Sequence, residues 1–293
     1  MFVTELGLGC MSIGTEEKAA RQIIDAALEE GINYFDTADL YDFGENEKIV
    51  GKALKEVREK VIIATKVGNR WNPGHDGWSW DPSKSYIKEE VKSSLKRLET
   101  DYIDLYQLHG GTFEDQIEET IEAFEELKSE GFIRYYGISS IRPNVIREYL
   151  DKSSIVSVMM QYSILDRRPE EEVLQLLHEN GVSVVTRGPL AKGLLSERML
   201  EKVAKNGYLD YSKDDLQKIM PLLKEKVASA RSFTEVALQY NLANPSVASV
   251  VAGASSIEQI RNNANAVKSQ PLTSEEVALI KEITKAGIYN EHR

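Results

Sequence analysis

The chain has 293 residues, of which 42% are hydrophobic and 28% charged, and this balance excludes a disordered or fibrous protein. Its formal net charge is −11, so we expect no general nucleic-acid binding, which needs a basic face, and no docking on anionic membranes. The sequence has one cysteine, Cys10, no apolar run of about 18 residues and no signal-peptide pattern. We therefore expect a cytoplasmic protein without an intrachain disulfide or a membrane span.

Short, nearly continuous apolar runs recur along the whole chain. Such runs are typical of strands that are buried on both faces of a parallel sheet. The predicted strands are Val3–Leu8, Ile32–Phe35, Val61–Thr65, Ile103–Leu108, Tyr135–Ile138, Val156–Met160, Val182–Thr186 and Val247–Val251.

Amphipathic stretches between these runs predict helices at Glu16–Glu30, Asn46–Leu54, Tyr86–Leu98, Phe113–Lys128 and Glu275–Lys285, and Ser232, Ser256 and Thr273 each begin a capping-box pattern. Alternating strands and helices imply parallel strands joined by right-handed crossovers. Eight such units predict an α/β fold, a (β/α)₈ barrel, with residues 1–293 as a single domain. The alternative is a doubly wound open sheet, but the third glycine of its nucleotide-binding motif is displaced in Gly7–Gly14.

Two long segments, Gly68–Pro82 and Lys192–Lys226, follow the third and seventh predicted strands. In a barrel both lie at the C-terminal end of the strands, where active sites are built. Four residues whose side chains could take part in catalysis also reach this end, namely Asp36, Tyr41, Lys66 and His109. Taken singly, Asp36 could cap a turn, Tyr41 could be a packed aromatic and His109 a loop residue. Because all four meet at one rim, we favour a catalytic interpretation.

The four residue types suit proton transfer to a carbonyl oxygen. A tyrosine hydroxyl can donate the proton, and a neighbouring Lys66 ammonium would favour the phenolate that remains. Asp36 would hold Lys66 in place, since a buried lysine is costly unless it is paired. His109 would orient the carbonyl by a hydrogen bond.

The segments that carry these residues resemble the motifs of the aldo-keto reductase family, in family order and over nearly the whole chain. They are Gly31-Ile-Asn-Tyr-Phe-Asp-Thr-Ala-Asp-Leu-Tyr-Asp42, Glu45-Asn-Glu-Lys-Ile-Val-Gly51, Ala64-Thr-Lys66, Leu95-Lys-Arg-Leu98, Asp101-Tyr-Ile-Asp-Leu-Tyr-Gln-Leu-His109, Ile133-Arg-Tyr-Tyr-Gly-Ile-Ser139, Gly188-Pro-Leu-Ala-Lys-Gly-Leu-Leu195 and Gly253-Ala-Ser-Ser-Ile-Glu-Gln-Ile-Arg-Asn-Asn263. The pattern is most similar to bacterial NADPH-dependent members.

The resemblance implies a catalytic tetrad of Asp36, Tyr41, Lys66 and His109 with Tyr41 as proton donor, and a nicotinamide cofactor that lies across the barrel mouth. The residues that match its cofactor positions are Ser139, Gln161, Pro189, Leu190, Lys192, Gly193, Gly253, Ser255, Gln259, Asn262 and Asn263. We add their neighbours Ser140, Arg187 and Gly188 to the predicted cofactor site. Cys10 and Met11 follow the first strand and could contact the cofactor or merely fill the rim. Arg187 departs from the family pattern, because an aromatic residue usually stacks on the nicotinamide there, and its planar guanidinium could replace that ring. Ser140 likewise stands where the family often has asparagine. Family members also carry an N-terminal hairpin, so either this hairpin is absent or the sequence starts late.

All three tryptophans, Trp71, Trp78 and Trp80, fall in the segment after the third strand, and we expect them to form an aromatic wall for apolar carbonyl substrates. A loop that packs on its own aromatics is the other interpretation. No cluster has metal-ligand spacing, so we expect no metal.

The sequence thus predicts an oxidoreductase that reduces a small aldehyde or ketone with NADPH, with NADH as a possible second cofactor, and acts as a monomer. Two alternatives stay open. One is a cofactor-sensing protein similar to the channel-associated members of the family, with little turnover. The other is a barrel lyase or isomerase acting on a phosphorylated sugar.

Overall fold

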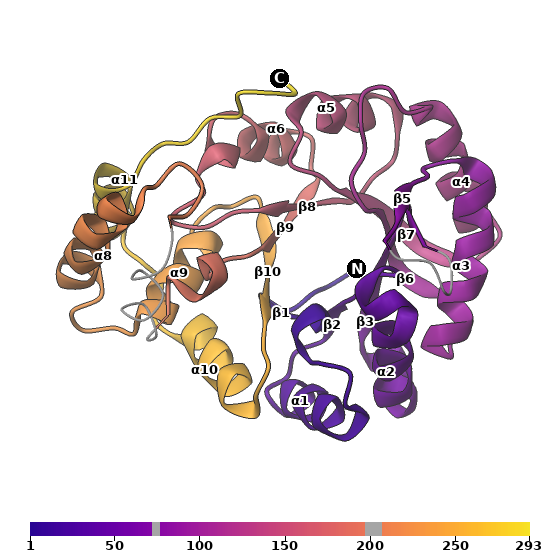
Figure 1. Ribbon diagram of the computed structural model, residues 1–293, viewed down its shortest axis with the longest axis horizontal. Coiled ribbons are helices and arrows are strands. Elements are labelled where there is room, and N and C mark those ends of the chain that lie inside the picture. The colour runs from indigo at the N-terminus through magenta and orange to yellow at the C-terminus, as the bar shows by residue number, and fades with distance from the viewer. Residues whose placement is uncertain (72–76, 197–206) are drawn as a thin grey trace.

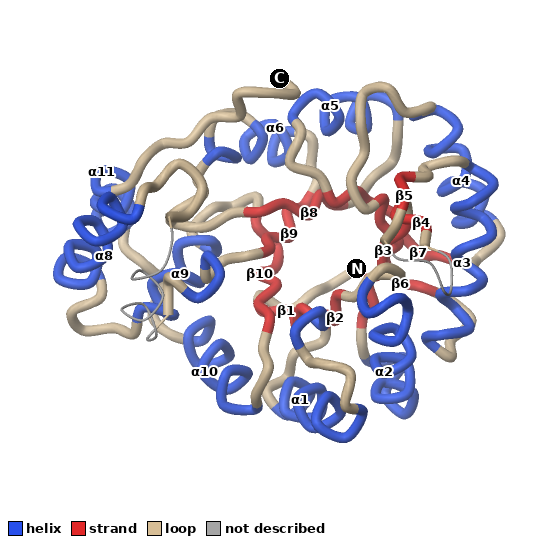
Figure 2. Tube along the Cα trace, in the orientation of Figure 1, coloured by secondary structure: helices blue, strands red, loops and turns tan. Residues whose placement is uncertain are grey.

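Eight parallel strands form a closed barrel in the order β1-β10-β9-β8-β7-β6-β3-β2. The computed structural model describes residues 1–71, 77–196 and 207–293, so part of each predicted long segment lies outside the described residues. Figures 1 and 2 show the helices surrounding the strands. The predicted barrel is confirmed. Its strands are β1 (Leu6–Gly9), β2 (Tyr34–Asp36), β3 (Ile62–Val67), β6 (Ile103–Leu108), β7 (Ile133–Ser139), β8 (Ser157–Gln161), β9 (Ser183–Arg187) and β10 (Val247–Gly253).

The barrel interior is filled by a separate small core. Its buried side chains are Tyr34, Ala64, Leu105, Met159, Val185 and Val251, one from each of six strands. Because alternate residues of a strand share a face, the residues two positions later also point toward the barrel axis, one layer nearer the mouth. That upper layer contains Asp36, Lys66, Gln107, Gln161, Arg187 and Gly253.

Most strands extend one or two residues beyond the predicted ends. The apolar runs stop at Phe35, Thr65 and Met160, whereas the strands continue through Asp36, Val67 and Gln161. The reason is that the last inward-facing residue of each strand reaches the open mouth, where polar side chains are tolerated. These strand ends therefore carry the residues of the candidate site.

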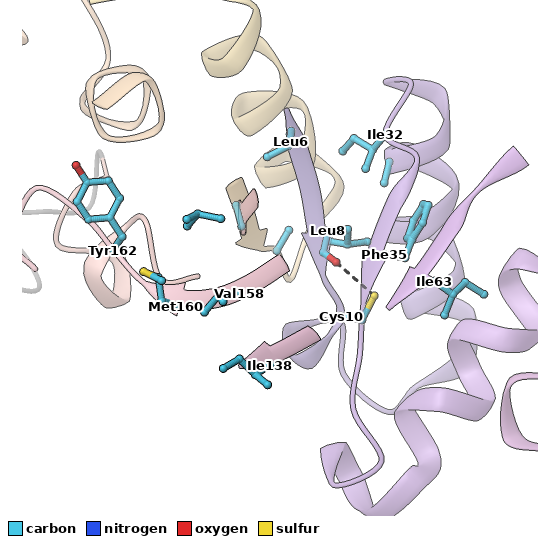
Figure 3. Close-up of a cluster of buried hydrophobic side chains, with 14 of the residues drawn as sticks. Leu6, Leu8, Cys10, Ile32, Phe35, Ile63, Ile138, Val158, Met160 and Tyr162 are labelled. Atoms are coloured by element: carbon cyan, nitrogen blue, oxygen red, sulfur yellow. Dashed lines mark hydrogen bonds between the residues drawn. The ribbon is translucent and has the colours of Figure 1, made fainter. Parts of the chain in front are cut away.

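The helices that surround the strands bury apolar stripes against them. They are α1 (Glu17–Glu29), α2 (Glu45–Leu54), α3 (Lys84–Leu98), α4 (Ile117–Ser129), α5 (Pro143–Lys152), α6 (Val173–Glu179), α8 (Lys213–Val227), α9 (Phe233–Leu242), α10 (Ile257–Lys268) and α11 (Ser274–Ile283). In α1, for example, Ala20, Ile23, Ile24 and Ala27 are buried. Figure 3 shows the outer core, in which Leu8, Phe35, Ile63 and Val158 lie among the labelled side chains. Of the described residues, no helix is long and apolar enough to cross a membrane.

Two details of the predicted helices are wrong. The helix expected from Phe113 begins only at Ile117, because the amide and hydroxyl of Thr112 donate to the Asp115 carboxylate at 2.7 and 2.8 Å and form a turn there. The capping boxes at Ser232 and Thr273 are confirmed. At Ser256 the hydroxyl accepts from the Gln259 amide, but the Gln259 side chain accepts from Ser255 instead, so the box is not reciprocal.

The segment Gly68–Pro82 contains a small antiparallel pair, β4 (Asn69–Arg70) with β5 (Ser79–Trp80). The segment Lys192–Lys226 contains most of α8, which begins with a capping box at Ser212. Both segments follow strands on the mouth side of the barrel, so they border the candidate site.

Candidate active site

The four residues of the predicted tetrad lie together at the barrel mouth. The Lys66 ammonium donates to the Asp36 carboxylate at 2.7 Å, to the Thr37 carbonyl oxygen at 2.7 Å and to the Tyr41 hydroxyl at 3.4 Å. Lys66 and Asp36 are only 1% and 4% exposed. The Tyr41 and His109 rings meet edge to face, with centroids 5.9 Å apart.

Backbone hydrogen bonds continue past the strand ends and hold three of these residues in register. The Thr37 amide donates to the Ala64 carbonyl at 2.9 Å, and the His109 amide donates to the Val67 carbonyl at 2.7 Å. The Asp39 amide donates to the carbonyl of Lys66 itself at 3.3 Å. Asp36, Lys66 and His109 are therefore carried by one continuous ladder.

Tyr41 lies on a different kind of backbone. It begins the short turn η2 (Tyr41–Gly44), in which Asp42 and Phe43 adopt left-handed conformations with φ of 48° and 51°. Non-glycine residues adopt such angles at an energetic cost and often near functional sites. The turn lifts the Tyr41 side chain over Lys66, whose ammonium lies 5.0 Å from the ring centroid.

Lys66 and His109, the two basic residues of the tetrad, differ in charge. Burial lowers the pKa of Lys66, but the charges of Asp36 and Tyr41 and their hydrogen bonds outweigh it, so its pKa is raised and the ammonium is retained. Burial, together with the Lys66 and Arg187 charges, lowers the pKa of His109 to about 3. His109 is thus a neutral imidazole, able to donate from one nitrogen and accept at the other.

Two buried atoms of the tetrad have no hydrogen-bond partner among the described residues. They are Oδ1 of Asp36 and Nδ1 of His109. Buried polar atoms are normally paired, so these atoms are consistent with a site that a ligand or water completes.

A polar network behind the mouth supports the tetrad strands. Thr37 donates to Asn46, which in turn donates to the carbonyl oxygen of Cys10. Thr65, next to Lys66, donates to the fully buried Glu47 at 2.6 Å, and Arg97 pairs with the other Glu47 oxygen at 2.6 Å. Asn46 and Glu47 lie in a family-like motif and at the start of a predicted helix, but no role was predicted for either side chain.

The residues predicted for the nicotinamide end lie on neighbouring strand ends. Ser139 ends β7, Gln161 ends β8 and Arg187 ends β9. Arg187 donates to the Gln161 Oε1 atom at 3.0 Å. Ser140 is buried and accepts from the Arg142 amide at 3.2 Å.

The predicted loop after β9 is a tight turn that leads into η5 (Ala191–Gly193). It comprises Gly188, Pro189, Leu190, Lys192 and Gly193, and both of its glycines have positive φ. Pro189 is buried, whereas Gly188 and Lys192 are exposed, so the chain presents backbone and a cation to solvent there.

The residues predicted for the adenosine end follow β10. A Cβ atom on Gly253 would lie 2.6 Å from the Ser12 hydroxyl, so a larger residue there would require the Ser12 side chain to move. The Ser255 amide donates to Gln259 Oε1 at 2.8 Å, just before the N-terminus of α10. Asn262 is exposed on this helix and Asn263 is buried.

Cys10 and Met11 differ in their surroundings although they are neighbours. The Cys10 thiol is fully buried in the outer core, faces the Leu8 carbonyl at 3.7 Å and has a pKa raised by burial (Figure 3). Its side chain is therefore turned away from the mouth. Met11 is 63% exposed.

Two of the three tryptophans are held by contacts beside the mouth. Trp71 donates to the Asp39 carbonyl at 3.1 Å and meets Phe43 edge to face, and Trp80 donates to Asp115 at 2.9 Å. Trp78 is 56% exposed. Trp71 and Trp80 are thus fixed, whereas Trp78 offers an open aromatic face. Among the described residues, no group of three or more His, Cys, Asp or Glu side chains could hold a metal ion.

The sequence analysis missed a polar group next to Gln161. Asp166 is fully buried, accepts from Gln161 at 2.8 Å and forms a bidentate ion pair with Arg168 at 2.7 Å. Tyr208 also lies 3.2 Å from the Gln161 amide nitrogen. The only signal was an acidic residue, five positions after Gln161 and followed by two arginines. Nothing in the sequence indicates that it turns back toward Gln161.

A family model described as "Aldo/keto reductase family" matches residues 5–285. The chain belongs to this family. It is 61% identical to the uncharacterized oxidoreductase YqkF of Bacillus subtilis over 99% of the chain and 96% of the relative, and 34% identical to the NADH-specific methylglyoxal reductase of Escherichia coli over 97% and 95%. The holo form of aldo-keto reductase AKR11C1 from Bacillus halodurans superposes with a TM-score of 0.95 at 62% identity, covering 99% and 95% of the two chains.

This membership identifies the aldo-keto reductase described here as an NAD(P)H-dependent oxidoreductase. It favours that class over the lyase or isomerase alternative. Membership alone leaves the substrate, the preferred nucleotide and the roles of single residues as proposals.

Proposed function

We propose that this aldo-keto reductase reduces aldehydes or ketones to alcohols with NADPH, and that Tyr41 donates the proton to the carbonyl oxygen. The observation that carries the proposal is the position of the Lys66 ammonium, 2.7 Å from Asp36 and 3.4 Å from the Tyr41 hydroxyl. A cation beside the hydroxyl stabilises the negative charge that develops on it as the proton leaves.

The other two members act through position and charge. Asp36 holds the ammonium and compensates its burial. His109, kept neutral, donates a hydrogen bond to the substrate oxygen without competing with Tyr41 as the acid. Trp71, Trp78 and Trp80 border the space that the rest of the substrate would occupy.

The residues at the mouth fit a nicotinamide dinucleotide. Ser139, Gln161 and Arg187 offer hydrogen-bonding groups at one end, and the free amides at the N-terminus of α10, beside Ser255 and Gln259, suit a phosphate at the other. The buried Asp36 Oδ1 and His109 Nδ1 atoms, which have no partner among the described residues, leave hydrogen-bonding capacity at the mouth for a ligand. When bound, the nicotinamide supplies the hydride for the carbonyl carbon.

The preference for NADPH is part of the proposal. Its support is the combination of Lys192, Ser255, Ser256 and Arg261 around the adenosine end. One relative is by name NADH-specific, so both nucleotides have to be compared. A monomer in the cytoplasm stays a prediction from the sequence.

The test follows the loss of reduced-nucleotide absorbance with an activated aromatic aldehyde and with methylglyoxal, for wild type and Tyr41→Phe. We expect turnover with NADPH by the wild type and a loss of about 10²–10⁴-fold in the variant, with nucleotide affinity retained. Tyr102→Phe, at the opposite end of the barrel, is the matched control. Nucleotide binding without turnover of any carbonyl would favour the sensor alternative, and an absence of nucleotide binding would refute the proposal.

A further inference from the structure

The Gln161 side-chain amide is held from both ends by groups of opposite hydrogen-bonding character. Its nitrogen donates to the Asp166 carboxylate at 2.8 Å, and its oxygen accepts from the Arg187 guanidinium at 3.0 Å. An amide has similar shape in its two orientations, so its neighbours decide which end points where. Here a carboxylate, which accepts, and a guanidinium, which only donates, both select the same orientation.

Asp166 is built to act as a fixed acceptor. Its side chain is fully buried, and both oxygens accept from Arg168, at 2.7 Å each, in a bidentate pair. Such pairs are strong and geometrically specific. Arg168 is itself confined, because its guanidinium lies 5.0 Å from the centroid of the Tyr289 ring and a Cβ on Gly287 would come within 2.9 Å of its side chain.

The second hydrogen of the Gln161 amide nitrogen also has a partner inside the protein. The Tyr208 hydroxyl lies 3.2 Å from it and can accept the second hydrogen. The oxygen, in contrast, faces the exposed Arg187 at the mouth. A carbonyl oxygen has two lone pairs, so one more hydrogen bond can be accepted there, but none can be donated.

We propose that Asp166 is a positioning residue that fixes the Gln161 amide with its oxygen toward the mouth, so that this end of the site selects a ligand carrying an amide N–H donor. The inference rests on the proposed function, in which the nicotinamide carboxamide is that donor. A ligand that presents only a carbonyl oxygen and a methyl group at this position finds no partner in Gln161.

The test compares dissociation constants for NADP⁺ and for its 3-acetylpyridine analogue, in which a methyl group replaces the carboxamide nitrogen. Binding is measured by calorimetry rather than by turnover, because the two rings differ in redox potential. The wild type should bind NADP⁺ at least about tenfold more tightly than the analogue. The reason is that the analogue cannot donate a hydrogen bond to the Gln161 oxygen and would leave this acceptor unpaired. In Asp166→Asn the Asn oxygen pairs with Arg168 and its NH₂ turns to Gln161. The buried acceptor of the Gln161 nitrogen is then lost, and only the exposed Arg187 still favours this orientation. The preference for NADP⁺ should therefore fall by about twofold or more.

Asp104→Asn is the matched control. Asp104 is likewise a buried carboxylate paired with an arginine, 2.8 Å from Arg58, but lies at the opposite end of the barrel. It should lose stability and keep the full preference for NADP⁺. If Asp166→Asn does not fold, the double variant Asp166→Leu with Arg168→Met removes the ion pair as a unit and leaves no unpaired charge. Its preference for NADP⁺ should also fall by about twofold or more.

The outcomes separate the two proposals. A wild type that binds both dinucleotides equally, an Asp166 variant that keeps the full preference, or an Asp104 variant that loses it equally overturns the role of Asp166 and leaves the proposed function intact. A wild type that binds neither dinucleotide refutes the proposed function, and the inference fails with it.

Discussion

The rings of Tyr41 and His109 meet edge to face with an angle of 81° between their planes. Tyr41 comes from a strained turn after β2 and His109 from the end of β6, so two separate backbones define one contact. The Tyr41 hydroxyl thus lies between a neutral imidazole and the Lys66 ammonium, which is 3.4 Å from it, so its two neighbours differ in charge.

Replacing Lys66 should affect both stability and turnover. Lys66→Met leaves Asp36 buried without its cation, and breaking a buried ion pair typically costs about 3–5 kcal/mol. Turnover should fall by about 10²-fold or more, since the ammonium beside Tyr41 is lost. Urea unfolding and steady-state rates measure the two effects. Lys52→Met, which removes the exposed pair with Glu17, should change neither, and an equally stable Lys66 variant would contradict the buried pairing.

His109 should make unfolding pH-dependent in the acid range. The unfolded histidine binds a proton below about 6.5, whereas the folded one, with a pKa of about 3, does not. Stability should therefore fall as the pH is lowered through this interval, by at most about 1.4 kcal/mol per pH unit for one proton. In His109→Gln this part of the slope should disappear from urea-unfolding data, and in the exposed His178→Gln it should persist. Identical slopes in wild type and His109→Gln would show that folding leaves the pKa of His109 unchanged.

Gly68→Ala should displace Trp80. The glycine has φ of +123°, and a Cβ there would lie 2.7 Å from the Trp80 ring. We expect a destabilisation of roughly 1–2 kcal/mol from the backbone, a changed tryptophan fluorescence spectrum and a raised KM for bulky apolar carbonyls.

Gly131→Ala is the control for this change, because its φ is +84° with nothing within 4 Å of the added Cβ. Gly131→Ala should lose a similar amount of stability from the backbone and leave the fluorescence spectrum and KM unchanged. An unchanged KM in Gly68→Ala would argue against the aromatic wall.

A negative charge at the start of α10 should select against NADPH. Ser255→Asp adds a carboxylate beside the amides that we assign to the adenosine phosphate. Its repulsion of that phosphate, at close range and partly screened by solvent, should weaken NADPH binding by about tenfold. The dissociation constant for NADH should change much less. Asn265→Asp, exposed further along the same helix, should leave the ratio unaltered, and equal weakening of both nucleotides would place the extra phosphate elsewhere.

Much of the fold could be predicted because its signals are local. Buried parallel strands need apolar residues on both faces, so the barrel strands appear as short runs such as Ile103–Leu108, which matches β6 to the residue. The meeting of Asp36, Lys66 and His109 could be predicted because each of them directly follows such a run, whereas Tyr41 lies on the turn η2 after β2. The strand ends could not, since Asp36 and Gln161 are polar for chemical reasons while their backbones still belong to the sheet.

The supporting contacts were beyond the reach of sequence patterns. Asp166 returns to Gln161 through an irregular segment closed by the Ser163–Asp166 backbone pair, and Arg97 reaches Glu47 from a different helix. Each contact depends on how separate elements pack, and no periodicity or spacing records that.

The pairing of β1 with β10 has a consequence for how the chain is made. Leu6 lies beside Val250. One edge of β1, the first strand to be synthesised, therefore stays unpaired until β10, the last strand, has been synthesised. Long-range pairings of this kind are slow and leave an unpaired edge exposed meanwhile. Because the loop after β10 also carries the predicted adenosine contacts, the nascent protein could acquire its ligand only once the barrel has closed, which makes cofactor binding a reporter of completed folding.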